Sequence, residues 1–177
     1  MTRLFALAFA AAALAGCAYR WTSPVPADMR TVSVPTFRNE SDVVELGAAA
    51  TRQVLREFQR EGTFRIAMPG DAALEIQGTV KSASAGQQFF KREVFSRGYE
   101  YRYTMEADVS LVDKRTGRVL VDNRRYEAQT TFFSDSDVVT ARRDASGRLA
   151  EDLARQIVDD VAGRRWDGEK ERKEKGK

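Results

Sequence analysis

The chain has a single cysteine, Cys17, and no histidine. A lone thiol can act as a nucleophile, a metal ligand or a point of covalent attachment. Catalysis by a thiol needs a neighbouring base, and no histidine is present to supply one. The usual zinc and haem sites also draw on histidine or on several cysteines. A metal site built from carboxylates alone would remain open, but the chain has no Asp/Asn-rich loop of the EF-hand type. We therefore expect no catalytic residues, no metal site and no cofactor, and we interpret Cys17 as a point of attachment.

The residues before Cys17 have the pattern of an export signal. Arg3 gives the N-terminus a positive charge, and residues 4–13 form an apolar run. This run is shorter than the roughly 20 residues that cross a bilayer, and small residues follow it. The sequence Leu14-Ala15-Gly16-Cys17 resembles the bacterial lipobox. The alternative is an ordinary signal peptide in which the cysteine is incidental.

The lipobox resemblance implies a covalent lipid as the only added group. Diacylglycerol would be attached to the sulfur of Cys17, residues 1–16 would be removed, and the new amine would be acylated. Two or more acyl chains anchor a protein stably, whereas one chain anchors it marginally. Ala18 stands where an aspartate would favour retention at the inner membrane, so we expect a lipid-anchored protein on the periplasmic side of the outer membrane.

Residues 17–30 contain Pro24 and Pro26 and no apolar period, which predicts an extended tether. A single domain is expected over residues 31–166, and the charged tail 167–177 is expected to be disordered. Residues 17–166 contain 23 basic and 22 acidic side chains. A body so close to neutral argues against nucleic acid as a partner.

Two amphipathic helices are expected, over residues 43–60 and 138–162. The residues at 39–42 (Asn-Glu-Ser-Asp) offer N-caps for the first helix, and Gly62 is suited to end it. In the second helix an apolar residue recurs every four positions, and we expect these residues to face the core: Ala145, Leu149, Leu153, Ile157 and Val161.

Strands are indicated where apolar and polar residues alternate, with residues 83–98 expected as a loop after the third strand. In Tyr99–Asp113 six of the seven even-numbered residues from Glu100 to Val112 are polar, which is typical of a sheet with one face buried and one exposed. A change of parity near Asp122-Asn123 indicates a bulge in the last strand. The expected strands are residues 31–37, 63–67, 73–82, 99–113 and 118–132.

These elements predict an α+β fold in two layers. Both helices would pack on one face of a mixed sheet of four to five strands. The other face would be exposed, and Trp166 would pack back on the domain. No internal repeat is present.

The order of these segments resembles the outer-membrane LPS-assembly lipoproteins, the LptE family. The resemblance covers nearly the whole domain and is carried by the lipobox and by a series of segments: "RTVSVPTFRNES" at 30–41, "VLREFQREGTFRI" at 54–66, "DAALEIQGTVKS" at 71–82, the hairpin beginning "YEYRYTMEADVSLVDKRTGRVL" and the helix "RLAEDLARQIVDDVA". It implies a non-catalytic protein. Family members lie within the lumen of the LptD barrel, plug it and assist its assembly, and have been proposed to bind LPS.

One loop could contact LPS. Residues 87–97 place Lys91, Arg92 and Arg97 among three phenylalanines, so cations could pair with phosphates while aromatic rings meet acyl chains. The simpler interpretation is an extended hairpin with a buried aromatic cluster and solvated charges. The exposed sheet face, with Glu100, Arg102, Glu106 and Asp108, could meet the polar interior of a barrel or simply face water.

Two other functions remain open at this stage. Lipoproteins that activate peptidoglycan synthases or serve curli-type secretion share a V-x-V-x-x-F-x-N strand, found here from Val32 to Asn39. A carboxylate-based glycosidase would need two acidic groups about 5–9.5 Å apart in a cleft. The acidic residues here fall mainly on polar faces of strands and helices, which disfavours such an enzyme.

Overall fold

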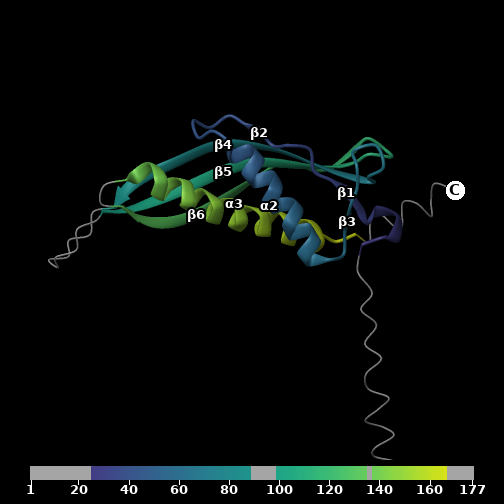
Figure 1. Ribbon diagram of the computed structural model, residues 1–177. Helices are drawn as coiled ribbons and strands as arrows, with labels where there is room; N and C mark the ends of the chain where they lie inside the picture. The colour runs from purple at the N-terminus through teal and green to yellow at the C-terminus, as the bar shows by residue number, and fades with distance from the viewer. Residues whose placement is uncertain (1–24, 89–98, 135–136, 167–177) are drawn as a thin grey trace, which may run out of the picture.

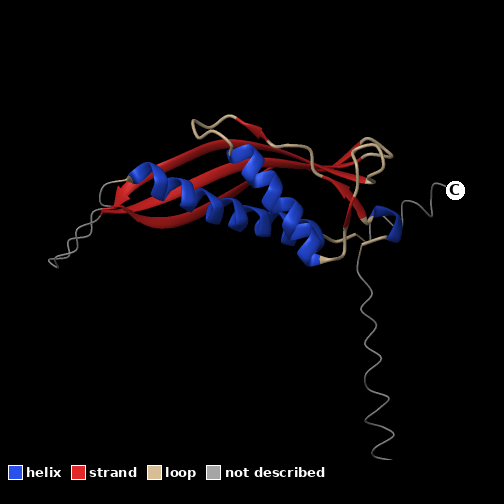
Figure 2. Ribbon diagram, viewed as in Figure 1, coloured by secondary structure: helices blue, strands red, loops and turns tan. Residues whose placement is uncertain are grey.

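A computed structural model describes residues 25–88, 99–134 and 137–166. Two helices, α2 (Leu46–Glu61) and α3 (Val138–Ala162), pack on one face of a mixed sheet and leave the opposite face bare (Figures 1 and 2). A short 3₁₀ helix, η1 (Ala27–Met29), precedes the sheet. The two-layer α+β prediction is confirmed.

The sheet contains six strands rather than four or five, in the order β3-β1-β4-β5-β6 with β2 alongside β4. The extra strand arises because the expected strand 31–37 is broken at Pro35, which has no N–H to donate. β1 ends at Ser33, and the chain returns to the edge of β4 as β2. The strands are β1 (Thr31–Ser33), β2 (Arg38–Asn39), β3 (Arg65–Ile66), β4 (Leu74–Gln88), β5 (Tyr99–Asp113) and β6 (Arg118–Ser134).

The three long strands form an antiparallel meander. The short strands pair in parallel: β1 lies between β3 and β4, and β2 pairs with β4. β5 has the predicted bounds, but β4 continues to Gln88, so the expected loop at 83–88 is wrong. Residues 82–88 lack the apolar alternation that marks a strand, and pairing with β5 extends them. The bulge near Asp122-Asn123 is confirmed, since Asn123 has a φ of 46° and its N–H donates to Ser110 Oγ at 2.9 Å.

Helix α3 has the predicted bounds, whereas α2 begins at Leu46, three residues later than expected. Residues 39–42 do not cap it, because Asn39 instead holds a turn with its amide bonded to the Val43 carbonyl at 2.9 Å. Glu45, in the left-handed conformation at φ 72°, precedes the first turn. Gly62 ends the helix as predicted, at φ 82°.

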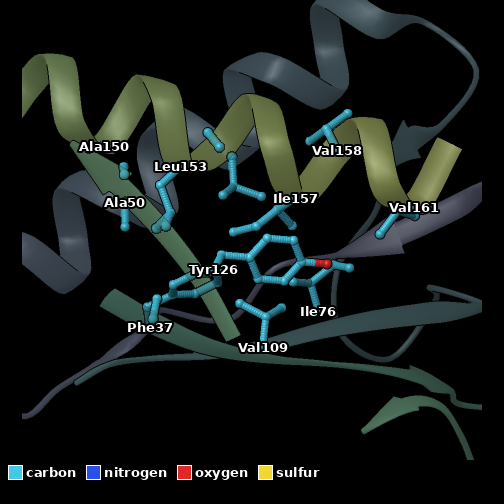
Figure 3. Packing of buried hydrophobic residues seen from close by; sticks show 14 of the residues in the cluster. Phe37, Ala50, Ile76, Val109, Tyr126, Ala150, Leu153, Ile157, Val158 and Val161 are labelled. Atoms are coloured by element: carbon cyan, nitrogen blue, oxygen red, sulfur yellow. The ribbon is translucent and has the colours of Figure 1, made fainter. Parts of the chain in front are cut away.

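The core lies between the helices and the sheet (Figure 3). The apolar residues that recur every four positions along α3 are all buried, as predicted. The Tyr126 ring lies between Ile157 of α3 and Ile76 and Val109 of the sheet (Figure 3). Trp166 is also buried, with its ring centroid 6.4 Å from that of Phe64. The last described residue thus packs on the domain, as expected.

Phe37 packs against one glycine of α2 and one glycine of β4, and so connects this helix to the sheet. A Cβ on Gly78 of β4 would lie 2.3 Å from the Phe37 ring, and one on Gly47 of α2 would lie 2.4 Å from the Phe37 carbonyl oxygen. The Phe37 N–H donates to Thr51 Oγ1 at 2.9 Å. The chain between β1 and β2 therefore passes between α2 and β4 at a point where neither Gly47 nor Gly78 can be replaced by a larger residue without a clash.

Candidate binding surfaces

The residues predicted to carry chemistry, Cys17, Lys91, Arg92 and Arg97, lie outside the described residues, so their roles stay predictions. Within the described ranges, no three acidic, cysteine or histidine side chains gather as a metal site would require. No helix in those ranges is both long and apolar enough to cross a bilayer. The candidate sites that can be built from geometry are the bare sheet face, two grooves and the two long sheet edges.

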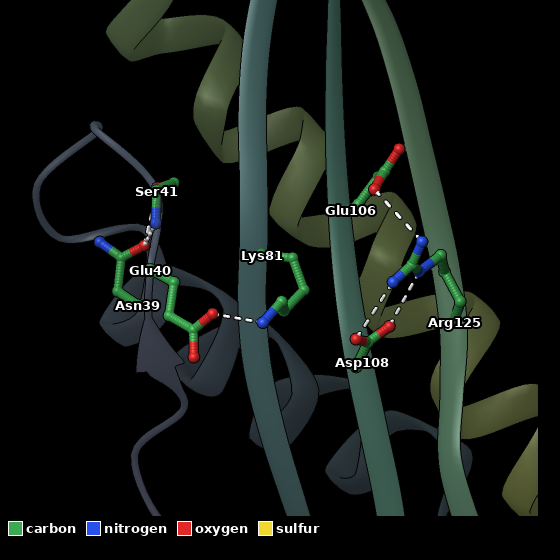
Figure 4. A network of polar contacts seen from close by, with 7 residues as sticks. All are labelled: Asn39, Glu40, Ser41, Lys81, Glu106, Asp108 and Arg125. Carbon is green, nitrogen blue, oxygen red and sulfur yellow. Dashed lines mark hydrogen bonds and ion pairs between the residues drawn. The ribbon is translucent and has the colours of Figure 1, made fainter.

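The bare face carries a polar network across neighbouring strands (Figure 4). Arg125 of β6 donates two hydrogen bonds to Asp108 of β5 from one edge of its guanidinium, Nε to Oδ1 at 3.0 Å and Nη2 to Oδ2 at 3.3 Å. Its Nη1 lies 4.0 Å from Glu106 Oε2. The hydrogen bonds from Arg125 lower the pKa of Asp108, which keeps this carboxylate charged. Toward β2, Lys81 of β4 pairs with Glu40.

These ion pairs are partly solvated, so each contributes little to stability, on the order of 1 kcal/mol or less. Of the four charged residues expected on this face, Arg102 is exposed and Glu100, Glu106 and Asp108 are partly exposed. The prediction of a wet face is therefore confirmed. Alternating cations and anions give this face many hydrogen-bonding groups. Two exposed apolar side chains, Phe133 and Val119 of β6, also lie on it, opposite Glu100 and Val112.

A groove of 390 Å³ opens on the same face beside the break between β1 and β2. At its end, Glu75 of β4 accepts a hydrogen bond from Gln77 Nε2 at 2.7 Å and pairs with Lys114 at 3.0 Å. The bond from Gln77, with help from Lys114, lowers the pKa of Glu75. The groove is polar, and its lining includes Pro35, Thr36, Arg38, Gln77, Asp108 and Asn123.

A second groove, of 520 Å³, lies between the first turns of α2 and α3. It combines apolar side chains with three arginines and one carboxylate, Glu45, and Val44 and Val139 on its rim are 84% and 73% exposed. Exposed valines beside arginines suit an amphipathic anion better than a small polar ligand. Sequence patterns did not indicate this groove, because its two walls are about 90 residues apart in the chain. Its lining includes Val43, Val44, Arg52, Val139, Arg142 and Arg143.

The edge of β6 is covered by side chains of α3. Arg148 donates to the Thr131 carbonyl at 3.3 Å, and Gln156 donates to the Glu127 carbonyl at 2.9 Å. Arg164, just beyond the helix, donates to the Leu120 carbonyl at 2.8 Å. The three donors recur every eight residues, and that spacing is the only sequence signal of their shared role. Three carbonyls that could otherwise accept from another strand are thus satisfied within the chain.

Residues 29–161 match the LptE family model, described as lipopolysaccharide-assembly. This chain belongs to the LptE family. No curated protein matches the sequence. The predicted resemblance to LptE is therefore confirmed over most of the chain, and with it the coarse theme of LPS assembly. LptE proteins are a non-enzymatic lipoprotein family.

Solved structures also resemble this LptE-family chain. A homolog of neuraminyllactose-binding hemagglutinin from Helicobacter pylori is 10% identical over 80% of this chain and 88% of its own, with a TM-score of 0.53. The PelC dodecamer from Paraburkholderia phytofirmans is 18% identical over 77% and 92%, with a TM-score of 0.46. A protein from Caulobacter crescentus, proposed to be a lipoprotein, is 17% identical over 76% and 92%, with a TM-score of 0.45. At these identities the first similarity supports the fold alone.

Proposed function

We propose that this chain is a lipid-anchored, non-catalytic lipoprotein that supports LPS assembly at the outer membrane from within an LptD-type β-barrel. The lipid on Cys17 holds it on the periplasmic side of that membrane. The domain fills the barrel lumen and assists assembly of the barrel. The proposal rests on membership of the LptE family and on the design of the sheet.

The observation that carries the proposal is the asymmetry of the two sheet faces. One face is buried beneath α2 and α3, and the other is bare and carries charged side chains of both signs. Barrel interiors are polar, so a lumen can offer complementary charges and hydrogen bonds to such a face. We propose that the bare face, centred on Asp108 and Arg125, contacts the lumen wall.

The groove between α2 and α3 is our candidate contact for LPS within the described residues. Arg52, Arg142 and Arg143 supply cations for phosphate, and Val44 and Val139 supply apolar surface for acyl chains. Direct binding of LPS is tested with the purified domain by comparing the wild type with Arg142→Glu/Arg143→Glu. Loss of LPS binding in this variant, with unchanged thermal unfolding, supports the groove. Unchanged binding directs attention to Lys91, Arg92 and Arg97.

The function itself is tested by depletion of the lipoprotein, followed by labelling of surface LPS and pull-down of its partners. We expect surface LPS to fall and a large β-barrel to co-purify. Normal surface LPS without a barrel partner would overturn the proposal. A penicillin-binding protein in the pull-down would instead support the activator of peptidoglycan synthesis, and a secretion channel would support the curli-type role.

The placement of the bare face is tested separately by photo-crosslinking in cells. A photoreactive residue replaces Arg125 on the bare face or, as a matched control, Arg155 on the exposed side of α3. Both residues are exposed arginines held by acidic neighbours. We expect the barrel to be captured preferentially from position 125, and preferential capture from position 155 would reverse the orientation.

A further inference from the structure

The two long outer edges of the meander differ in how their backbone groups are satisfied. The edge of β6 is covered by donors from α3, whereas β4 beyond Val80 pairs only with β5 within the described residues. The last described contact on its outer side is the Glu40 N–H bonded to the Val80 carbonyl at 2.9 Å. The segment from Ser82 to Gln88, here called the open edge, has no described neighbour on that side.

The direction of each backbone group on the open edge follows from the register. Gln156 bonds the Glu127 carbonyl, so Glu127 points away from β5, and its partner Glu106 points toward β4. Glu106 is paired with Ser82, which therefore bonds inward to β5. Alternation along the strand then turns three residues outward, each with one N–H and one C=O toward the open edge: Ala83, Ala85 and Gln87.

The open edge lacks most of the features that normally block strand addition. Edge strands are usually protected by charge, proline, bulges or a covering element. Residues 82–88 contain no charged residue and no proline, and they include two alanines, two serines and one glycine. The bulge of β4 at Lys81 and both of its charged residues, Glu75 and Lys81, come before this segment and leave it regular. Small side chains at 82–86 leave room for a neighbouring strand.

We propose that the open edge is a strand-addition site for an extended segment of the barrel partner. Outward N–H and C=O groups repeat every second residue, about 6.8 Å apart, which is the repeat of an extended backbone. An extended peptide is thus the ligand that these groups recognise, as in other cases of β-augmentation. The open edge also adjoins Lys81 on the bare face, so it continues the surface proposed above to meet the lumen. This inference rests on the proposed function for the identity of its partner.

The test measures amide hydrogen exchange over residues 82–88 in the full-length lipoprotein, alone and in the complex purified with the barrel. In the protein alone, the three outward amides should exchange fast and the four that bond β5 should exchange slowly. In the complex, about three further amides should become protected. If the complex forms and these amides still exchange fast, strand addition is wrong while the proposed function stands. If no barrel co-purifies, both proposals fail.

A variant pair tests the same point by binding. Ala85→Pro removes one outward N–H without removing a bond to β5, and Ala85→Ser keeps that N–H at the same exposed position. We expect Ala85→Pro to lower barrel binding by roughly tenfold or more, and Ala85→Ser to leave it near the wild-type level. Equal binding by both folded variants would overturn the proposal. Slow exchange of the outward amides in the isolated chain would also overturn it. If that protection depends on protein concentration, a second copy covers the open edge; if it does not, a segment of the same chain covers it.

Discussion

The two ends of the sheet are held in different ways. At the parallel end, β1 and β3 are only three and two residues long, and β1 lies between β3 and β4 and pairs with both. At the antiparallel end, β4, β5 and β6 are 15 to 17 residues long and pair along almost their whole length. The short strands need side chains from distant parts of the chain, whereas the long strands are held by their own backbone ladder.

Because of this difference, the buried side chains that stabilise the fold and the exposed surfaces proposed for binding lie at different ends of the sheet. At the parallel end, Phe37 and Trp166 are buried and fasten the sheet to the helices. At the antiparallel end, backbone hydrogen bonds between the long strands stabilise the sheet. The bare face and the open edge can therefore stay uncovered. We therefore expect substitutions at the parallel end to lower the free energy of unfolding more than comparable substitutions at the antiparallel end.

The largest effect is expected at Trp166. Trp166→Ala should lower the free energy of unfolding by about 3–5 kcal/mol, because it removes a fully buried aromatic side chain that packs against Phe64. Trp166→Phe should cost less than half of this, since the indole N–H has no hydrogen-bond partner in the described residues. Urea unfolding of the mature domain measures both. Equal losses for the two variants would show that the indole itself, rather than aromatic packing, is required.

A second comparison places the same substitution at both ends of one strand. Gly78→Ala should cost about 1–3 kcal/mol or more, because its Cβ would overlap the Phe37 ring. Gly86→Ala meets nothing within 4 Å and should be neutral or stabilise by up to about 1 kcal/mol, since glycine weakens a strand. Thermal unfolding of the two variants gives the difference directly. Similar midpoints would mean that Phe37 moves away at little cost.

At the antiparallel end the sequence predicted β5 correctly but ended β4 at Ser82 instead of Gln88. The bounds of β5 and α3 were predicted correctly because each shows a clear period, two for the strand and four for the buried face of the helix. The exposed face was predicted from the same alternation. These signals are local, so they can be read without knowledge of the rest of the chain.

What could not be predicted depends on contacts between distant segments. The sixth strand exists because the chain crosses over Gly78 after Pro35, and α2 starts late because Asn39 holds a turn instead of a cap. The grooves and the covered edge of β6 each combine residues from two or more elements. The roles of Cys17, Lys91, Arg92 and Arg97 stay predictions from the sequence.

The covered edge of β6 can be tested by removing one donor. Gln156→Ala should cost about 0.5–1.5 kcal/mol, because the Glu127 carbonyl loses its bond at the edge. Arg155→Ala, at the adjacent position on α3, removes only exposed ion pairs with Glu151 and Asp152 and should cost about 0.5 kcal/mol or less. Chemical denaturation separates the two values. A larger loss for Arg155→Ala would mean that the contact to the β6 edge does not stabilise the fold.

The smallest effect is expected from acid at the bare face. Arg125 holds the pKa of Asp108 below its usual value of about 3.9, so the bond stabilises the fold fully above that pH. This stability is lost as the pH falls from about 4 through the lower folded pKa, because protonation of Asp108 then weakens its pairing with Arg125. Asp108→Asn should therefore reduce the acid-induced loss, by less than about 1 kcal/mol because the pair is partly solvated. Unfolding curves at pH 7 and pH 3 measure the change against Asp144→Asn, which removes an exposed carboxylate of α3. An equal change in both variants would show that net charge, rather than the pairing of Asp108 with Arg125, sets the acid response.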